Sequence, residues 1–151
     1  MPGLTFRDCP LCKMKNIDKY HALVCLNARR TVRSYAHDNV EKVVHELYRD
    51  DAGLISYRQP KWDTRGELTD LQVHSDEGQT KEIDFVTILP IADSYASDAA
   101  AMQGSAAEKA AKLKTNKHGP SCEAAGIDFV PFAIESFGLL GKAAIKEVQG
   151  I

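Results

Sequence analysis

The chain has 151 residues, of which 44% are hydrophobic and 26% are charged, and this composition suits a soluble globular protein with a single core. Its formal net charge of −2 provides no overall positive field for nucleic acid, and its apolar runs are too short to cross a bilayer. The first residues, Met1-Pro2-Gly3, lead into no long apolar segment, so we expect no secretory signal.

The first feature along the chain is a group of metal-ligand side chains with the spacing Cys-x2-Cys-x8-His-x3-Cys. Its members are Cys9, Cys12, His21 and Cys25. Pro10 favours the tight turn that a Cys-x2-Cys pair needs, and positions 21 and 25 share one face if they lie on a helix. Four such ligands can close a tetrahedron around zinc; the alternative is that the thiols are buried without a metal. Because a closed site has no position for water, we expect this zinc knuckle, residues 1–27, to stabilise the fold rather than to catalyse a reaction.

A long helix is predicted from about residue 28 to residue 51, because apolar residues recur at spacings of three and four and Gly53 follows as a stop signal. Three arginines lie near its start: Arg29, Arg30 and Arg33. They could contact phosphate, but a solvated helix face is the simpler interpretation of this group taken alone.

Another stripe of the same helix carries metal-ligand residue types four positions apart, namely His37, Glu41 and His45. Three such side chains could hold a metal ion. We nevertheless expect a solvated helix face, because a stripe of this kind more often faces water than it binds metal.

A β-hairpin is predicted in the middle of the chain. Residues 68–73 and 82–90 are rich in β-formers and lie on either side of a turn that contains glycine. With the centre of the turn at Glu77, residues equidistant from it face each other across the two strands. Asp70 then lies opposite Asp84, with the Cβ atoms about 5 Å apart.

This pairing would place two carboxylates on one face of the hairpin, opposite the apolar residues of the core. Close carboxylates repel each other unless a positive charge lies between them, and Mg²⁺ is commonly held by one or two carboxylates. Such a site can activate a water for hydrolysis of a phosphodiester bond. The alternative is a solvated hairpin face with a different register.

The remaining elements are a short strand before the hairpin and an Ala-rich region after it. Residues 105–108 fit the capping box Ser-x-x-Glu and predict the start of a helix that reaches about residue 115. The other segments are a strand over 54–58, a loop over 116–126, a strand over 127–138 that Pro131 interrupts, and a closing helix over 139–148.

The order of these motifs resembles a known family. A Cys-x2-Cys…His-x3-Cys knuckle, an Arg-rich helix with a histidine, two aspartates on a hairpin, an Ala-rich helix with lysines and the segment FVPFAIESFG follow one another from Cys9 to Gly141. They are similar to the restriction-like endonuclease region that follows the reverse transcriptase in many non-LTR retrotransposons. That region is similar to the PD-(D/E)XK nuclease fold. The resemblance therefore implies an α+β (mixed α/β) fold over residues 28–151, in which a small central β-sheet flanked by helices follows the zinc knuckle and the long helix.

The resemblance also implies a Mg²⁺-dependent endonuclease that hydrolyses phosphodiester bonds of DNA. Asp70 matches the aspartate of the family's Pro-Asp element, and Asp84 matches the acidic residue of the next strand, so both would be catalytic ligands of Mg²⁺. Two positions depart from the family pattern. Thr69 stands where the family has proline, and Val86 stands where it has the catalytic lysine, so loss of activity stays an alternative.

In variants of this fold a lysine on the following helix takes the catalytic place. The candidate here is Lys112, with Lys109 and Lys114 behind it, and such a lysine would orient the attacking water and offset phosphate charge. Lys109 and Lys114, like the three arginines of the first helix, are also expected DNA contacts. A surface role is the alternative for each lysine. Glu135 in the late strand matches a glutamate of the family, and we expect it either to support the catalytic residues from behind or to have a structural role.

The resemblance implies DNA and an adjacent reverse transcriptase domain as partners, and no membrane. The expected location is intracellular, in the nucleus if the source is a eukaryote. Three clustered cysteines with Cys122 alone also favour a reducing compartment over a disulfide framework. A second functional class stays open: a zinc-stapled module that binds nucleic acid or protein and is catalytically inactive.

Overall fold

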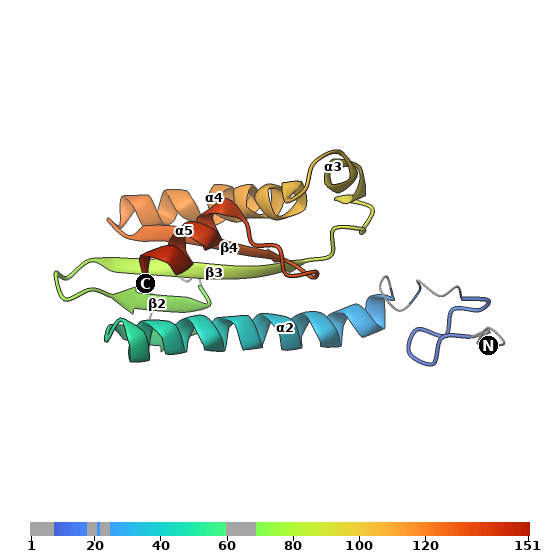
Figure 1. Ribbon diagram of the computed structural model, residues 1–151, viewed down its shortest axis with the longest axis horizontal. Coiled ribbons are helices and arrows are strands. Elements are labelled where there is room, and N and C mark those ends of the chain that lie inside the picture. Colours follow the sequence, from blue (N-terminus) through green and yellow to red (C-terminus); the bar gives the residue numbers. More distant parts are fainter. Residues whose placement is uncertain (1–7, 18–20, 22–24, 60–68) are drawn as a thin grey trace. The chain divides into compact units, whose positions relative to one another are not determined.

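The computed structural model describes residues 8–17, 21, 25–59 and 69–151. The chain divides into two compact units, Met1–Ala36 and His37–Ile151. Helix α2, Leu26–Glu46, runs through this division (Figure 1). The boundary expected after residue 27 also lies within this helix.

The second unit begins with the later turns of α2, which continue into a short π-helical segment, η1 (Leu47–Asp51). Together α2 and η1 confirm the long helix predicted to end at residue 51. Val40, Val44 and Tyr48 recur every four residues, so they lie on one face of the helix and pack into the core.

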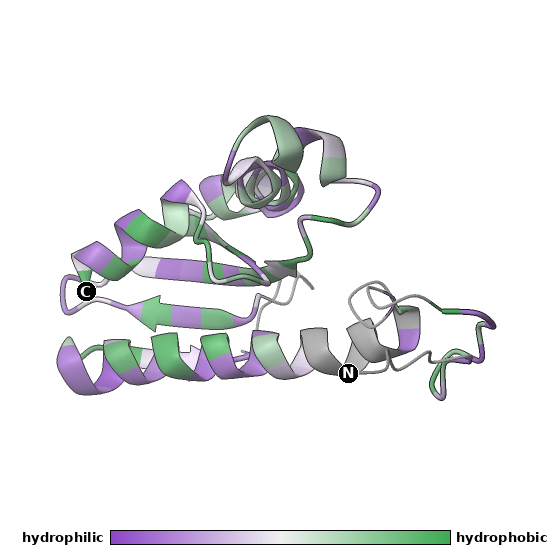
Figure 2. Cartoon of the chain, turned by 45° about the vertical axis from the view of Figure 1, so that its right-hand side comes forward, coloured by the Kyte–Doolittle hydropathy of each residue, from purple (hydrophilic) through white to green (hydrophobic). Residues whose placement is uncertain are grey.

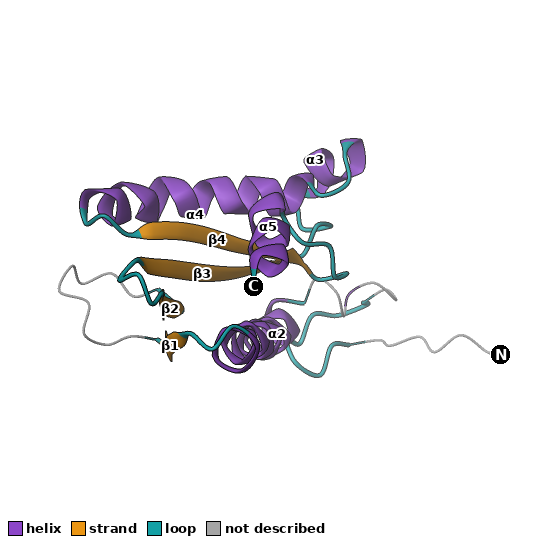
Figure 3. Ribbon diagram, turned by 60° about the vertical axis from the view of Figure 1, so that its left-hand side comes forward, coloured by secondary structure: helices purple, strands orange, loops and turns teal. Residues whose placement is uncertain are grey.

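A four-stranded mixed sheet forms the centre of the second unit, in the order β1-β2-β3-β4 (Figure 3). Its strands are β1 (Ile55–Arg58), β2 (Leu71–His74), β3 (Thr80–Ile88) and β4 (Asp128–Glu135). Strands β1, β2 and β3 pair antiparallel, whereas β4 pairs parallel to β3. The parallel pair needs a crossover connection, which helix α4 (Ser105–Ala124) provides. The fold is therefore mixed α/β with a small sheet, as the sequence predicts.

The register of the hairpin formed by β2 and β3 agrees with the predicted one. Leu71 pairs with Ile83 and Gln72 pairs with Glu82, so the paired residues are equidistant from position 77. Strand β2 starts later than predicted because the chain bends at Asp70, and residue 68 lies outside the described part of the chain.

One face of the sheet carries the apolar core of the second unit. Leu71 and Val73 of β2 meet Ile83 and Phe85 of β3, which confirms the predicted core face. Helix α2, segment η1 and helix α5 (Lys142–Gly150) cover this face with the side chains Val44, Tyr48 and Ala144. Figure 2 shows the apolar and polar residues that alternate along β2, an alternation that places one set on each face of the sheet.

Helix α4 covers the opposite face of the sheet. Alanines of its first half pack against apolar residues of β3 and β4; the cluster is Val86, Ile88, Ala106, Ala107, Ala110, Ala111 and Ala133. The hairpin face that carries Asp84 is therefore buried: Glu82 is 1% exposed and Asp84 is 4% exposed. Its interpretation as a solvated face is wrong.

Helix α4 is longer than predicted, because the expected loop over 116–126 is helical as far as residue 124. Pro120 lies inside this helix and cannot donate the usual backbone hydrogen bond. His118 and Cys122, four residues apart, are both buried on the face that meets the sheet. Their burial explains why the helix continues through the proline.

Two glutamates connect the helix ends to neighbouring elements. The predicted capping box does not form; Glu108 Oε1 instead accepts a hydrogen bond at 2.6 Å from the backbone N–H of Lys142, the first residue of α5. Glu135 Oε1 accepts a hydrogen bond at 3.3 Å from the backbone N–H of Ala107, in the first turn of α4. Glu135 therefore has a structural role, as expected.

The C-terminal elements differ from the prediction in their limits. Strand β4 runs unbroken through Pro131, because β4 lies at the edge of the sheet, where a residue without an N–H is tolerated. Helix α5 begins at Lys142 and not at 139, since Leu140 forms an isolated bridge with Ile134. A short helix, α3 (Ala96–Ala101), precedes α4.

Candidate functional site

The four predicted metal ligands of the first unit lie together. One ligand atom from each of Cys9, Cys12, His21 and Cys25 lies within 4.8 Å of the others. The Sγ atoms of Cys9 and Cys25 are 3.7 Å apart, and Cys12 Sγ is 3.2 Å from His21 Nε2. These four side chains are close enough to hold one metal ion, which is compatible with a structural zinc.

The backbone around Cys9 and Cys12 forms the turn that brings their thiols together. Lys13 adopts a φ of 63°, and its N–H donates to the carbonyl oxygen of Cys9 at 3.0 Å. The N–H of Cys12 donates to Cys9 Sγ at 3.4 Å, and this contact lowers the pKa of Cys9 to about 6. Since the thiolate is the form that binds metals, the turn favours metal binding. His21 and Cys25 are joined by a hydrogen bond of 2.7 Å from the N–H of Cys25 to the carbonyl of His21.

In the second unit, Asp70 and Asp84 come together as the hairpin register predicts. Asp84 lies in β3, Asp70 lies in the bend before β2, and the two carboxyl groups are close enough for each to shift the pKa of the other. Burial raises the pKa of Asp84 above its usual value; Lys114 opposes this shift and Asp70 adds to it. Burial acts on Asp70 in the same direction, but hydrogen bonds from His37, Asp84 and Phe85 hold the pKa of Asp70 below its usual value. The negative charge of the pair is therefore favoured on Asp70, and a shared proton is favoured on Asp84.

Two donors fix the carboxylate of Asp70. The backbone N–H of Phe85 donates to Oδ2 at 2.7 Å, and Nε2 of His37 lies 3.1 Å from the same oxygen. The hydrogen bond with Asp70 raises the pKa of His37 to about 9, so the ring is protonated at neutral pH and forms an ion pair. Asp70 is thus held both by its hairpin partner and by helix α2.

Lys114, not Lys112, reaches the carboxylate pair. Its Nζ lies 2.8 Å from Oδ2 of Asp84, and Nε2 of His118 lies 3.3 Å from the same oxygen. Lys114 and His118 are four residues apart, on the face of α4 that meets the sheet. Lys112 comes two residues before Lys114, so its side chain points about 200° away around the helix, and it is exposed. Of the three candidate lysines, Lys114 is therefore the one whose ammonium group contacts Asp84, whereas Lys112 does not.

Lys109 and Lys112 lie instead on a separate surface of α4, in a groove that Asp98 also lines. Nζ of Lys109 is 2.7 Å from Oδ2 of Asp98 and 2.9 Å from the carbonyl oxygen of Ser94. A DNA contact through Lys109 would compete with this exposed ion pair. The side chains of the other expected DNA contacts lie outside the described residues: Arg29, Arg30 and Arg33.

A further group of buried polar side chains continues along β3, and sequence reasoning missed it. Glu82 accepts a hydrogen bond at 3.3 Å from Nε2 of Gln72 and one at 3.5 Å from the thiol of Cys122. Lys114, His118 and Cys122 follow one another at intervals of four, so they share one face of α4. The four-residue spacing could have indicated this helix face from the sequence. It has that meaning only if the segment is helical, and the sequence predicts a loop over 116–126.

The stripe of His37, Glu41 and His45 is not the solvated helix face that the sequence suggests. Glu41 is completely buried, and Nε of Arg58 donates to its Oε1 at 2.9 Å. His45 Nδ1 lies 2.7 Å from the hydroxyl oxygen of Ser56 in β1. His45 is thus not grouped with the other two, whereas ligand atoms of His37 and Glu41 lie within 4.8 Å of each other.

The two positions that depart from the family pattern are both buried. Thr69 is 3% exposed, and Val86 packs in the apolar cluster under the alanines of α4. Where the strand lacks a lysine, Lys114 approaches Asp84 from the helix that covers the strand.

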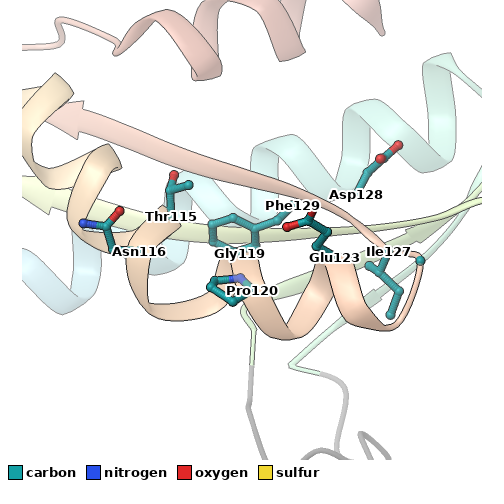
Figure 4. Close-up of a pocket in the computed structure, with 9 residues that line it drawn as sticks. Thr115, Asn116, Gly119, Pro120, Glu123, Ile127, Asp128 and Phe129 are labelled. Atoms are coloured by element: carbon teal, nitrogen blue, oxygen red, sulfur yellow. The ribbon is translucent and has the colours of Figure 1, made fainter.

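A groove of about 760 Å³ lies between the second half of α4 and the start of β4 (Figure 4). Its lining includes Asn116, Glu123 and Asp128, with Phe129 beside Pro120. Neither Asp70, Asp84 nor Lys114 lines it, so the groove is separate from the carboxylate pair.

The protonation of His37 should depend on Asp70. In protein that retains the metal of the cysteine cluster and no other, an imidazole ¹⁵N titration should give a pKa of about 9 for His37, falling toward 6.5 in Asp70→Asn. Because the folded-state pKa is raised, the charged ring stabilises the fold fully below about pH 6.5, and this stabilisation is lost as the pH rises through about 9. A pKa of His37 that is the same in wild type and Asp70→Asn would contradict the ion pair.

Comparison of the sequence with known proteins does not identify a family for this chain. No family model matches the sequence, and no curated protein is significantly similar to it. Among the described residues, no helix is long and apolar enough to cross a membrane. The function therefore has to come from the residues that the fold brings together.

Proposed function

We propose that the chain is the metal-dependent endonuclease domain of a retroelement protein and that it hydrolyses phosphodiester bonds of DNA. The observation that carries this proposal is the meeting of Asp70, Asp84 and Lys114, which come from the bend before β2, from β3 and from α4. Two carboxylates and a lysine are the set that the resemblance to PD-(D/E)XK nucleases implies. A mixed sheet flanked by helices supports the same proposal.

Asp70 and Asp84 would hold Mg²⁺, an ion that one or two carboxylates commonly bind together with waters and phosphate oxygens. When bound, the ion would lower the pKa of an attacking water and stabilise the negative charge that builds on the phosphate. The raised pKa of Asp84 fits this role, because a carboxylate whose charge is unfavourable to bury is stabilised by a nearby cation. Phe85 and His37 would keep the carboxylate of Asp70 oriented.

Lys114 would act on the phosphate and on the attacking water. Its side chain is 29% exposed, so the ammonium group can be reached from solvent although Asp84 is buried. With Mg²⁺ at the carboxylates, the ammonium group would turn from Asp84 to a phosphate oxygen and offset its charge. This role is the one that the family assigns to the lysine at the position of Val86.

The cysteine cluster would hold a structural zinc. Three cysteines and one histidine fill all four positions of a tetrahedral site, so this zinc would contribute folding free energy and no hydrolysis. The expected partner is DNA, together with an adjacent reverse transcriptase domain. With a net charge of −2, the isolated chain should bind DNA weakly and with a steep dependence on salt.

Nicking of supercoiled plasmid DNA in Mg²⁺ tests the proposal through two matched variants, Lys114→Ala and Lys112→Ala. Each removes one lysine from the same helix, but Lys114 contacts Asp84 whereas Lys112 is exposed on a separate surface. We expect Lys112→Ala to nick like the wild type and Lys114→Ala to be about 100-fold slower or worse. Equal activity of the two variants, at equal melting temperature, would show that Lys114 has no part in hydrolysis.

A second candidate function is a zinc-stapled module that binds nucleic acid or protein without cutting. The observation in its favour is that each carboxylate already has a cationic neighbour, His37 beside Asp70 and Lys114 beside Asp84. Such pairs can satisfy both charges without a metal ion. This candidate predicts that Mg²⁺ leaves the melting temperature unchanged.

A further inference from the structure

One buried carboxylate oxygen of the second unit has no role in the proposed nuclease site. Glu41 is 0% exposed, and its Oε1 accepts a hydrogen bond at 2.9 Å from Nε of Arg58. Its Oε2 is also buried but has no hydrogen-bond partner within the part of the chain that the structure describes. Burying an unpaired carboxylate oxygen is costly, so this oxygen is suited to bind a positively charged ligand.

Two other residues of α2, His37 and Asp38, have possible metal-ligand atoms close to those of Glu41. One atom from each of His37, Asp38 and Glu41 lies within 4.8 Å of the others. His37 and Glu41 are one helical turn apart, so they share a face of α2. The side chain of Asp38 is 62% exposed, which opens the group to solvent although Glu41 is buried.

The ring of His37 is oriented as in many metal sites. Its Nε2 lies 3.1 Å from Oδ2 of Asp70, and its Nδ1 lies 3.2 Å from Oδ1 of Asp38. Histidines that bind metals commonly donate the second ring N–H to a carboxylate, which fixes the ring and leaves the other nitrogen for the ion. Here Asp70 is the acceptor beside Nε2, and Nδ1 lies beside Asp38.

We propose that His37, Asp38 and Glu41 bind a divalent first-row transition-metal ion, such as Mn²⁺, at a site distinct from the cysteine cluster and from the Asp70–Asp84 pair. One imidazole nitrogen and two carboxylate oxygens favour such an ion over Mg²⁺, which prefers oxygen ligands. The site does not depend on the proposed nuclease activity, because Asp70 contributes to it only through its hydrogen bond with His37.

The charges around the site favour a dication. Asp38, Glu41 and Asp70 bring three negative charges to His37, and Arg58 brings one positive charge beside Glu41. A divalent ion bound to a neutral His37 makes the charge of this group zero. Such neutralisation is what a buried carboxylate requires.

Titration of Mn²⁺ into the 151-residue chain, with zinc loaded at its cysteine cluster, tests the proposal, because the six-line electron paramagnetic resonance spectrum of free Mn²⁺ weakens when the ion binds. The wild type should bind two ions, one at the Asp70–Asp84 pair and one at the new site. Asp38→Asn should weaken binding of one ion by about tenfold or more and leave the other unchanged. Glu46→Gln is the matched control, since it removes a carboxylate about 12 Å further along the same helix and should retain both ions.

The variant Asp84→Asn separates the two sites. It should retain one Mn²⁺, and that ion should broaden the NMR signals of the His37 ring. Glu41→Gln, checked for folding by its melting temperature, should lose the same ion as Asp38→Asn. If Asp38→Asn and Glu41→Gln bind Mn²⁺ like the wild type, the new site does not exist. If those two variants lose an ion and Asp84→Asn loses none, the new site stands and the metal of the proposed nuclease fails.

Discussion

Replacing Cys12 with serine, or chelating the metal of the cysteine cluster, is expected to unfold the first unit and to leave the second unit folded. The described residues of both apolar clusters belong to the second unit, so we expect metal binding by the four clustered side chains to order the segment 9–25. A structural zinc site contributes on the order of 10 kcal/mol of folding free energy. Loss of one thiolate removes most of this stabilisation.

A ¹H–¹⁵N NMR spectrum measures this effect residue by residue. In Cys12→Ser the signals of residues 9–25 should move to random-coil positions, while those of core residues such as Phe85 and Phe132 stay in place. Cys122→Ser is the control, because Cys122 is the cysteine outside the cluster and should leave residues 9–25 ordered. Purified protein that contains no metal, or a Cys12→Ser spectrum with an ordered first unit, would contradict the zinc assignment.

Asp70→Asn and Asp84→Asn are expected to have different effects on stability without Mg²⁺, although each removes one carboxylate charge. Folding lowers the pKa of Asp70, so the native state favours its charge, and Asp70→Asn should cost about 1.5–3 kcal/mol through the lost charged hydrogen bonds. Folding raises the pKa of Asp84, so the native state disfavours its charge, and a neutral amide there should change stability by less than about 1 kcal/mol. Urea unfolding at neutral pH measures both.

Mg²⁺ should then stabilise the wild type but neither Asp70→Asn nor Asp84→Asn. An ion that binds only the folded state adds about 2.7 kcal/mol at a concentration of 100 times its Kd. Both asparagine variants lack a ligand and should show no shift, whereas Asp98→Asn, which removes an exposed carboxylate beside Lys109, should respond like the wild type. Mg²⁺ stabilisation that persists in Asp84→Asn would show that the ion binds elsewhere.

The hairpin and its two aspartates could be predicted because their signals are local. Leu71 and Val73 alternate with polar residues, as do Ile83 and Phe85, and a shift of one residue would expose these apolar side chains. A short turn joins the strands, so the same alternation that buries the core also brings Asp70, in the bend before β2, near Asp84 of β3. The proximity of Cys9, Cys12, His21 and Cys25 was equally predictable, since their spacing lies within one short segment.

The partners of the two aspartates could not be predicted, because they depend on how helices pack on the sheet. Lys112 and Lys114 have the same chemistry, and only the rotation of α4 about its axis decides which of them meets Asp84. Gly119 and Pro120 favour a loop, and a loop would place His118 in irregular structure. In the structure His118 is buried and lies within helix α4. The contact of Glu41 with Arg58 joins α2 to β1, and no sequence period encodes such a pair.

A plasmid-nicking assay tests the central claim most directly. Supercoiled DNA is incubated with the wild type or with Asp84→Asn, in EDTA-free buffer with Mg²⁺ or without it. We expect Mg²⁺-dependent nicking by the wild type and a loss of at least about 1,000-fold in Asp84→Asn, with the melting temperatures of the two proteins within a few degrees of each other. Nicking by Asp84→Asn at the wild-type rate, or a zinc-loaded and folded wild type that never nicks DNA in Mg²⁺, would contradict it.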